Sequence, residues 1–242
     1  MELAIAAAAE GPYVVGVDLS GHPGVGDAST FVEPLVRARQ AGLKLTVHVA
    51  ELLRPHDTGM LLAMRPDRLG HATTLDHGSK PVFHRSIPIE ACLTSNLKSN
   101  TVVSADVHHF LDLWMAGVPV CLCTDDKGEY GWGCTAIDCG SMYNLAPMWF
   151  MPPSAAPLLM PSLLSPPFAH TCQLPLRQTG VFQTTLSNEY VLATSVFGLD
   201  ADHVYKLARE AVEYAFCNEV TKDRLRMLFA RDKDAVLALW ER

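Results

Sequence analysis

The sequence predicts an α/β fold built on a parallel sheet, and three observations support this prediction. Short apolar runs typical of buried strands alternate with segments of helical periodicity. The connections between these segments are short, as repeated βα units require. Several of the apolar runs also end in residues that can bind or activate a metal ion. The alternation leaves two arrangements open, an open doubly wound sheet and a closed barrel.

The expected elements follow one another regularly through the first half of the chain. Apolar, β-branched runs predict strands at 13–19, 43–49, 68–72, 89–93 and 120–123. Helical spacing between them predicts helices at 30–41, 57–64, 76–84 and 107–115. Pro55 precedes the second of these helices, and Gly117 with Pro119 leads into the last strand.

The carboxyl-terminal part of the sequence predicts two helices that cover the sheet. Asp200 or Asp202 can cap the first of them. The apolar face of this helix consists of Val204, Leu207, Ala208, Ala211, Val212 and Ala215, and the second helix carries Leu225, Met227, Leu228 and Phe229. Both apolar faces are expected to point into the core, which favours a structural role over a functional one.

The residues that carry chemistry gather at the ends of three expected strands. His48 and Glu51 end the second strand, His71 ends the third, and Asp125 with Asp126 follows the fifth. Because the carboxyl ends of parallel strands meet at one edge of a sheet, we expect these side chains to share one mouth. Histidine nitrogen and aspartate oxygen are good zinc ligands, so His48 and Asp125 are the candidate metal ligands.

The other residues of this series suit proton transfer and substrate binding. Glu51 can pass a proton to a substrate, and His71 can accept a proton from a metal-bound water or stabilise the charge that forms on it. Asp126 is free to hydrogen-bond the substrate. A lone histidine on a strand is more often structural, and an Asp-Asp pair often caps a helix. The ordered series nevertheless predicts a metal-dependent hydrolase.

Composition narrows the class of protein. The chain has 242 residues, of which 49% are hydrophobic, which suffices for one large core. Its formal net charge is -7 without a basic cluster, so we expect neither nucleic acid nor a membrane as partner. The amino end lacks the pattern of a signal peptide. Seven cysteines, an odd number, are expected to be reduced thiols, which favours a cytoplasmic protein.

The segment 129–179 differs from the rest of the chain. Its interior, 130–176, has Asp138 as its one charged residue and holds eight of the sixteen prolines. It is too apolar for a solvated linker and too rich in proline for a core element. Codons for its two edges can form an intron donor and an acceptor. We therefore interpret it as a retained-intron insert of low order between two parts, 1–128 and 180–242, of one domain.

With these motifs the sequence resembles the adenosine deaminases, zinc enzymes that close a (β/α)8 TIM barrel of the metallo-dependent hydrolase type. The resemblance implies that His48 in HVAE and Asp125 in CTDD bind zinc. It implies that Glu51 is the catalytic proton donor and that His71 in GHAT assists the attacking water. The expected reaction is hydrolytic deamination of a purine at C6, with a small-molecule nucleoside or nucleotide as substrate.

Further motifs extend this resemblance. Gly21, which ends VGVDLSG, matches the glycine whose backbone N–H meets the purine, and Asp126 matches the residue that holds the purine. Ser95 and Asn96 in LTSN match as architecture around the site. TSNLKSN, TDDKG, GVF and LSNEY resemble the adenosine deaminase-like branch, for which the implied reaction is N6-methyl-AMP to IMP plus methylamine. The family is monomeric, whereas the oligomeric state of this chain stays open.

The sequence also departs from the family. A His-x-His pair that supplies two further zinc ligands is missing, and His108 with His109 has the wrong spacing to replace it. We therefore expect an incomplete barrel with about strands 4 to 8, as in a truncated or alternatively spliced product. The alternative to an enzyme is then a catalytically inactive fragment that at most binds a partner.

Other readings of the sequence have less support. The SGHPGVG segment at 20–26 has the wrong glycine order for a phosphate loop. Cys121 with Cys123, and Cys134 with Cys139, lack the spacing of a structural zinc site and are interpreted as buried thiols. The HxE and PCxxC signature of the cytidine-type zinc deaminases is absent.

Overall fold

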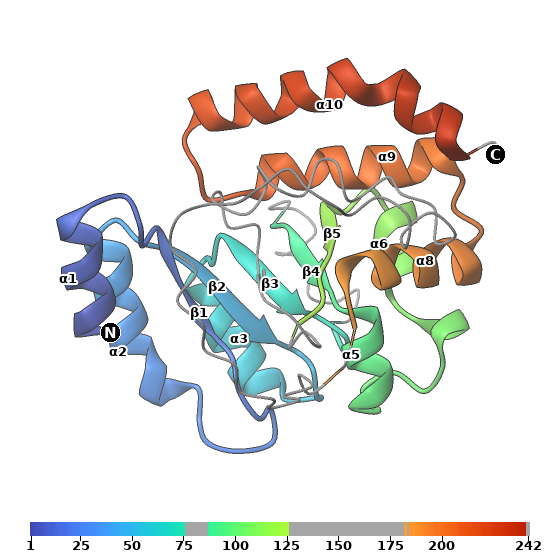
Figure 1. Ribbon diagram of the computed structural model, residues 1–242. Coiled ribbons are helices and arrows are strands. Elements are labelled where there is room, and N and C mark those ends of the chain that lie inside the picture. Colours follow the sequence, from blue (N-terminus) through green and yellow to red (C-terminus); the bar gives the residue numbers. More distant parts are fainter. Residues whose placement is uncertain (76–86, 126–181, 183, 241–242) are drawn as a thin grey trace, which may run out of the picture.

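The computed structural model describes residues 1–75, 87–125, 182 and 184–240. Within these residues a single parallel sheet of five strands lies at the centre, in the order β1-β2-β3-β4-β5 (Figure 1). The strands are β1 Gly16–Leu19, β2 Lys44–Val49, β3 Arg68–His71, β4 Ile89–Ala91 and β5 Val120–Leu122. Each strand pairs with the next one along the chain, as repeated βα units require. The predicted strands and their parallel arrangement are confirmed, with shorter bounds.

The core lies where one face of the sheet meets the surrounding helices. Leu45, Val47, Leu69, Ile89 and Val120 are buried almost completely, and all belong to one hydrophobic cluster. The helices α2 (Ser29–Gln40) and α3 (Pro55–Ala63) contact β2 from the cluster side. Side chains alternate across a strand, so the residues between these apolar ones, among them His48, point to the opposite face.

The helical predictions are confirmed in part. α2 and α3 match the first two expected helices, and the expected helix at 76–84 lies entirely outside the described residues. The segment 107–115 is not one helix: a 3-10 turn, Ala105–Val107, precedes α6, Phe110–Met115. His108 between them has an extended backbone and accepts a hydrogen bond from the backbone N–H of Phe110, which starts a new helix.

Three helices were not predicted, namely α1 Glu2–Glu10, α5 Leu93–Lys98 and α8 Leu186–Phe197. α5 replaces the end of the fourth expected strand, because the chain turns directly after Ala91 and the backbone N–H of Asn96 bonds to the carbonyl of Cys92. This turn places Ser95 and Asn96 on a helix immediately after the sheet.

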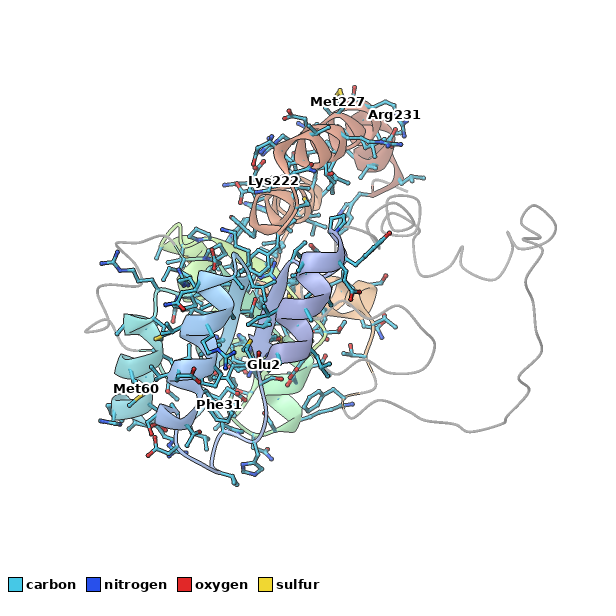
Figure 2. All side chains as sticks on the ribbon, turned by 90° about the vertical axis from the view of Figure 1, so that its left-hand side faces the viewer. Glu2, Phe31, Met60, Lys222, Met227 and Arg231 are labelled. Atoms are coloured by element: carbon cyan, nitrogen blue, oxygen red, sulfur yellow. The ribbon has the colours of Figure 1, made fainter. Side chains whose placement is uncertain are left out.

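The carboxyl-terminal helices α9 (Ala201–Glu210) and α10 (Glu219–Trp240) pack against each other beside the sheet (Figure 1). Asp200 caps α9 by accepting a hydrogen bond from the backbone N–H of His203, as predicted. Leu225 is buried, but Met227 is 65% exposed and lies on the outer side of α10 (Figure 2), so the prediction for Met227 was wrong. Positions two apart on a helix point in different directions. Among the described residues no helix combines the length and the apolarity needed to cross a membrane.

Candidate active site

The carboxyl ends of β2, β3 and β5 converge on the side chain of His71. Its Nε2 lies 3.2 Å from Nδ1 of His48, 3.5 Å from Oδ2 of Asp125 and 3.8 Å from Oε2 of Glu51. The structure therefore brings together four of the six residues singled out from the sequence. Asp126 lies outside the described residues.

The backbone bends sharply at these strand ends. Ala50, His71, Ala72 and Asp125 all have positive φ angles, between 54° and 60°, although none is glycine. Such conformations are uncommon for residues with a Cβ and persist where surrounding contacts enforce them. Their concentration after β2, β3 and β5 marks this edge of the sheet as a candidate functional site.

Gly70 leaves the space in which the His48 ring lies, and the carboxylate of Asp18 favours the protonated form of this ring. Gly70 pairs with His48 between β2 and β3, and a Cβ at Gly70 would lie 2.5 Å from Cδ2 of His48. Oδ2 of Asp18 lies 3.5 Å from Nε2 of His48. Burial opposes the cation, but the hydrogen bond and the charge of Asp18, with the charges of Asp125 and Glu90, raise the pKa of His48 to about 9.

Glu51 has the environment of a proton donor. Its carboxyl group is largely buried, and Oε1 lies 3.9 Å from Nδ1 of His48. Burial raises the pKa of Glu51, and the nearby charge of Asp125 acts in the same direction, whereas the charge of His48 opposes it. A carboxylic acid that keeps its proton closer to neutral pH can deliver it to a substrate.

His71 is buried and held from behind by polar groups. Its Nδ1 lies 3.1 Å from Nδ2 of Asn96, and Nε2 of His109 donates to its backbone carbonyl over 2.7 Å. Burial, together with the charges of His48 and His109, lowers the pKa of His71 to about 3. His71 is therefore a neutral imidazole at neutral pH.

Asp125 is held by a residue of the LTSN motif. Oγ of Ser95, which is buried on α5, donates to Oδ2 of Asp125 over 2.7 Å. This bond leaves the other carboxylate oxygen available to a ligand. Ser95 and Asn96 thus contact Asp125 and His71, respectively, from one helix.

Gly21 lies with His48 and Glu51 on a cavity of about 300 Å³. The chain at Gly21 has a φ of +142°, which favours glycine, and the space around its Cβ position is open. The loop after β1 forms much of the cavity wall, including His22 and Val25. The cavity is large enough for a small molecule next to the predicted proton donor.

Donors for a metal ion are present in two overlapping groups. His48, Glu51 and His71 form one, and His71, Cys92 and Asp125 form the other, each with ligand atoms within 4.8 Å of one another. Nitrogen, oxygen and sulfur donors of this kind suit zinc. Within the described part of the chain no such group contains both His48 and Asp125, the pair expected from the sequence, because His71 lies between them.

Sequence reasoning missed Asp18, His108 and His109. Asp18 lies within the VGVDLSG motif, where an acidic residue inside an apolar strand was an available signal. The two histidines fall in a segment with helical periodicity, which concealed their contacts with Asn96 and His71. The interpretation of Cys121 and Cys123 as buried thiols is confirmed, whereas Cys134 and Cys139 lie outside the described residues.

Comparison with known proteins identifies the origin of this arrangement. Residues 1–135, more than half of the chain, match the family model described as adenosine deaminase. This chain belongs to the adenosine deaminase family. The predicted family is thereby confirmed.

Curated relatives carry more specific names. The N6-methyl-AMP deaminase of Homo sapiens is 34% identical over 232 residues, and that of Danio rerio is 36% identical over 232 residues. Both alignments cover 93% of this chain, but they cover only 51% and 52% of the relatives. The chain thus spans about half the length of these relatives.

Solved structures establish the fold. The Arabidopsis protein ADAL in complex with IMP has a TM-score of 0.71 at 30% identity, covering 97% of this chain and 54% of that chain. The adenine deaminase of Arthrobacter aurescens, at 15% identity, has a TM-score of 0.65 and covers 96% of this chain and 58% of that chain. The expected (β/α)8 barrel fold is confirmed, and the five described strands form part of such a barrel.

Proposed function

We propose that this chain carries a hydrolytic purine deaminase site, with N6-methyl-AMP as substrate and IMP and methylamine as products. The observation that carries the proposal is the convergence of His48, Glu51 and Asp125 on Nε2 of His71, within 3.8 Å. The names of the curated relatives and the IMP and GMP complexes of similar solved structures support a purine nucleotide as ligand.

Zinc is the proposed cofactor, with His48 and Asp125 as ligands from this chain. When bound, zinc makes a water molecule easier to deprotonate, so that its oxygen can attack C6 of the purine. Ser95 orients the Asp125 carboxylate, and Asp18 lies beside the far nitrogen of His48. Such partners of ligand side chains fix their orientation.

Glu51 supplies the proton that the purine ring needs as water adds at C6. Its raised pKa keeps the acid form present at a pH at which an exposed glutamate has lost it. His71 hydrogen-bonds the oxygen that adds. The leaving amine takes up one proton of the water and departs as methylamine, the other proton restores the acid form of Glu51, and the oxygen stays on the purine. Gly21 and Asp126 are proposed to bind the purine ring.

The test combines metal analysis with an assay of methylamine release from N6-methyl-AMP. We expect bound zinc and turnover in the wild-type chain. Glu51→Gln should retain zinc and lower turnover by about 10²–10⁴-fold, because it removes the acid and preserves the shape. Glu33→Gln, an exposed position on α2, is the matched control and should leave turnover unchanged. Equal turnover in Glu51→Gln and wild type would refute the assigned role.

A second candidate is a non-catalytic fragment that binds a partner. It is favoured by the two donor groups among the described residues, neither of which joins His48 with Asp125. A wild-type chain that folds but neither retains zinc nor releases methylamine would establish this alternative.

We also propose the domain organisation and compartment expected from the sequence. The parts 1–128 and 180–242 form one domain interrupted by an insert at 129–179, and the protein acts in the cytoplasm. Free thiols at Cys92, Cys121, Cys123 and Cys217 support a reducing compartment. Sequencing of transcripts across this region tests the retained intron, because transcripts that all contain the segment would contradict it.

A further inference from the structure

A chain of hydrogen bonds leads from a backbone N–H to the site. The N–H of Phe110 donates to Nδ1 of His108 over 3.0 Å, and Nε2 of His108 lies 3.2 Å from Oδ1 of Asn96. Nδ2 of Asn96 lies 3.1 Å from Nδ1 of His71. His71, Asn96 and His108 are at most 3% exposed, so water cannot replace a mismatched contact.

The direction of the first bond fixes all the others. A backbone N–H is always a donor, so Nδ1 of His108 must accept and carries no hydrogen. The neutral His108 ring therefore has its proton on Nε2 and donates it to Asn96. The atom of Asn96 that receives this proton must be the amide oxygen, which removes the usual ambiguity between its oxygen and nitrogen.

With the oxygen of Asn96 assigned, its nitrogen faces His71. An amide nitrogen only donates, so Nδ1 of His71 must accept and the single proton of neutral His71 lies on Nε2. Asn96 also lies 3.0 Å from Oγ1 of Thr101 and 3.3 Å from Oγ1 of Thr73. Both threonine hydroxyls can accept a hydrogen bond from Nδ2 of Asn96, so neither changes the assignment of the amide nitrogen as the donor to His71.

We infer that Asn96 is a positioning residue that, through the His108 contact, holds His71 as the tautomer with its proton on Nε2, facing Glu51 and Asp125. A ring nitrogen that already carries a proton has no free lone pair, so Nε2 of this tautomer cannot take a proton from an attacking water. Of the two roles that the sequence leaves open for His71, the geometry thus selects hydrogen-bond donation to the developing oxygen anion over proton acceptance.

His48 couples to this network. A His71 that donates from Nε2 needs an acceptor at Nδ1 of His48, 3.2 Å away, and this leaves the His48 proton on Nε2 beside Asp18. In a cationic His48 two hydrogens would face each other across this contact. A metal ion on Nδ1 of His48 would replace the hydrogen there but would use the same lone pair, so the Nε2–H of His71 would then face Oδ2 of Asp125, 3.5 Å away.

Nitrogen NMR of the full chain with ¹⁵N-labelled histidine tests the inference, because protonated and unprotonated ring nitrogens give distinct shifts. The His71 signals are assigned by their loss in His71→Gln, without substrate and both with and without zinc. We expect the Nε2–H tautomer of His71 in the zinc-loaded protein. A His71 that carries its proton on Nδ1, or on both nitrogens, overturns the inference.

Two variants separate positioning from a general structural role. Asn96→Asp offers only acceptors, so His71 should move its proton to Nδ1 or become cationic. Thr101→Val removes the hydroxyl that accepts a hydrogen bond from Asn96, and it should leave the tautomer of His71 unchanged. If Asn96→Asp folds and His71 keeps the same tautomer, the role of Asn96 is overturned. If this variant does not fold, the tautomer of His71 in the wild-type spectrum decides the inference. The inference rests on the site of the proposed function, but the NMR measurement of the His71 tautomer does not depend on turnover. A failure of the inference can therefore be told apart from a failure of the proposed function.

Discussion

Two walls of the site differ in how they hold their side chains. The closed wall, formed by His71, Ser95, Asn96 and His108, is at most 3% exposed and joined by hydrogen bonds. The open wall, formed by Gly21, His48 and Glu51, borders the cavity of about 300 Å³. A buried and fully paired wall fixes the positions of protons, whereas an open wall can admit and adapt to a ligand. Stability and chemistry are thus expected to depend on different walls.

The largest effect on stability is expected in the closed wall. Asn96→Ala should lower the free energy of unfolding by about 2–4 kcal/mol, because it leaves several buried polar partners unpaired. Urea unfolding followed by circular dichroism measures this loss. Asn188→Ala, at an exposed position of α8, is the control and should change stability by less than about 0.5 kcal/mol. Similar small losses in both variants would contradict a closed wall that contributes to stability.

In the metal-free protein the two walls should also differ in the pH range over which they lose their contribution to stability. Burial holds the pKa values of His71 and His108 at about 3, below the ordinary 6.5, so their contribution is lost as pH falls from 6.5 towards 3. The pKa of His48 is raised to about 9, so its contribution is lost as pH rises from 6.5 through 9. Stability should therefore be greatest near pH 6.5.

Urea midpoints measured from pH 4 to pH 9.5 test this curve. His48→Gln should flatten the alkaline side, with a smaller change on the acidic side because the charge of His48 contributes to the lowered pKa of His71. His108→Gln should flatten the acidic side alone. Zinc should also flatten the alkaline side, because it takes the place of the His48 proton. Equal flattening of both sides by one variant would contradict the separation of the walls.

A smaller effect is expected in the open wall. Gly21→Ala should cost about 1 kcal/mol, because alanine is strained at a φ of +142° although the surrounding space is open. Gly59→Ala, within α3 and equally unobstructed, should instead stabilise by about 0.5–1 kcal/mol. Thermal unfolding of the pair measures the difference, and two stabilising substitutions would show that Gly21 is not strained.

The smallest effect is expected outside both walls. Deletion of 129–179, which joins Gly128 to Gly180, should change the free energy of unfolding by less than about 0.5 kcal/mol if the segment is an insert. Unfolding in urea and zinc binding of the shortened chain provide the measurement. A shortened chain that fails to fold would exclude the proposed domain organisation.

Local patterns predicted the strands and the convergence of their ends, because strand periodicity and parallel topology depend on sequence neighbours. α1 could have been found, since its alanines have the highest helix propensity. α5 could not, because its polar residues Ser95 and Asn96 are buried by contacts with Asp125 and His71 that lie far apart in sequence. The roles of Asp18, His108 and His109 likewise depend on distances that no spacing rule contains.

Gly70 has no side chain, and this leaves the space that the His48 ring occupies. One methyl group at this position would occupy the space of the His48 ring, with 2.5 Å between the two carbons. Alanine at Gly70 would therefore displace the His48 ring, which belongs to a proposed metal ligand, from its place at the site. The absence of a side chain at Gly70 in β3 thus controls whether the imidazole of His48 in β2 can lie at the site.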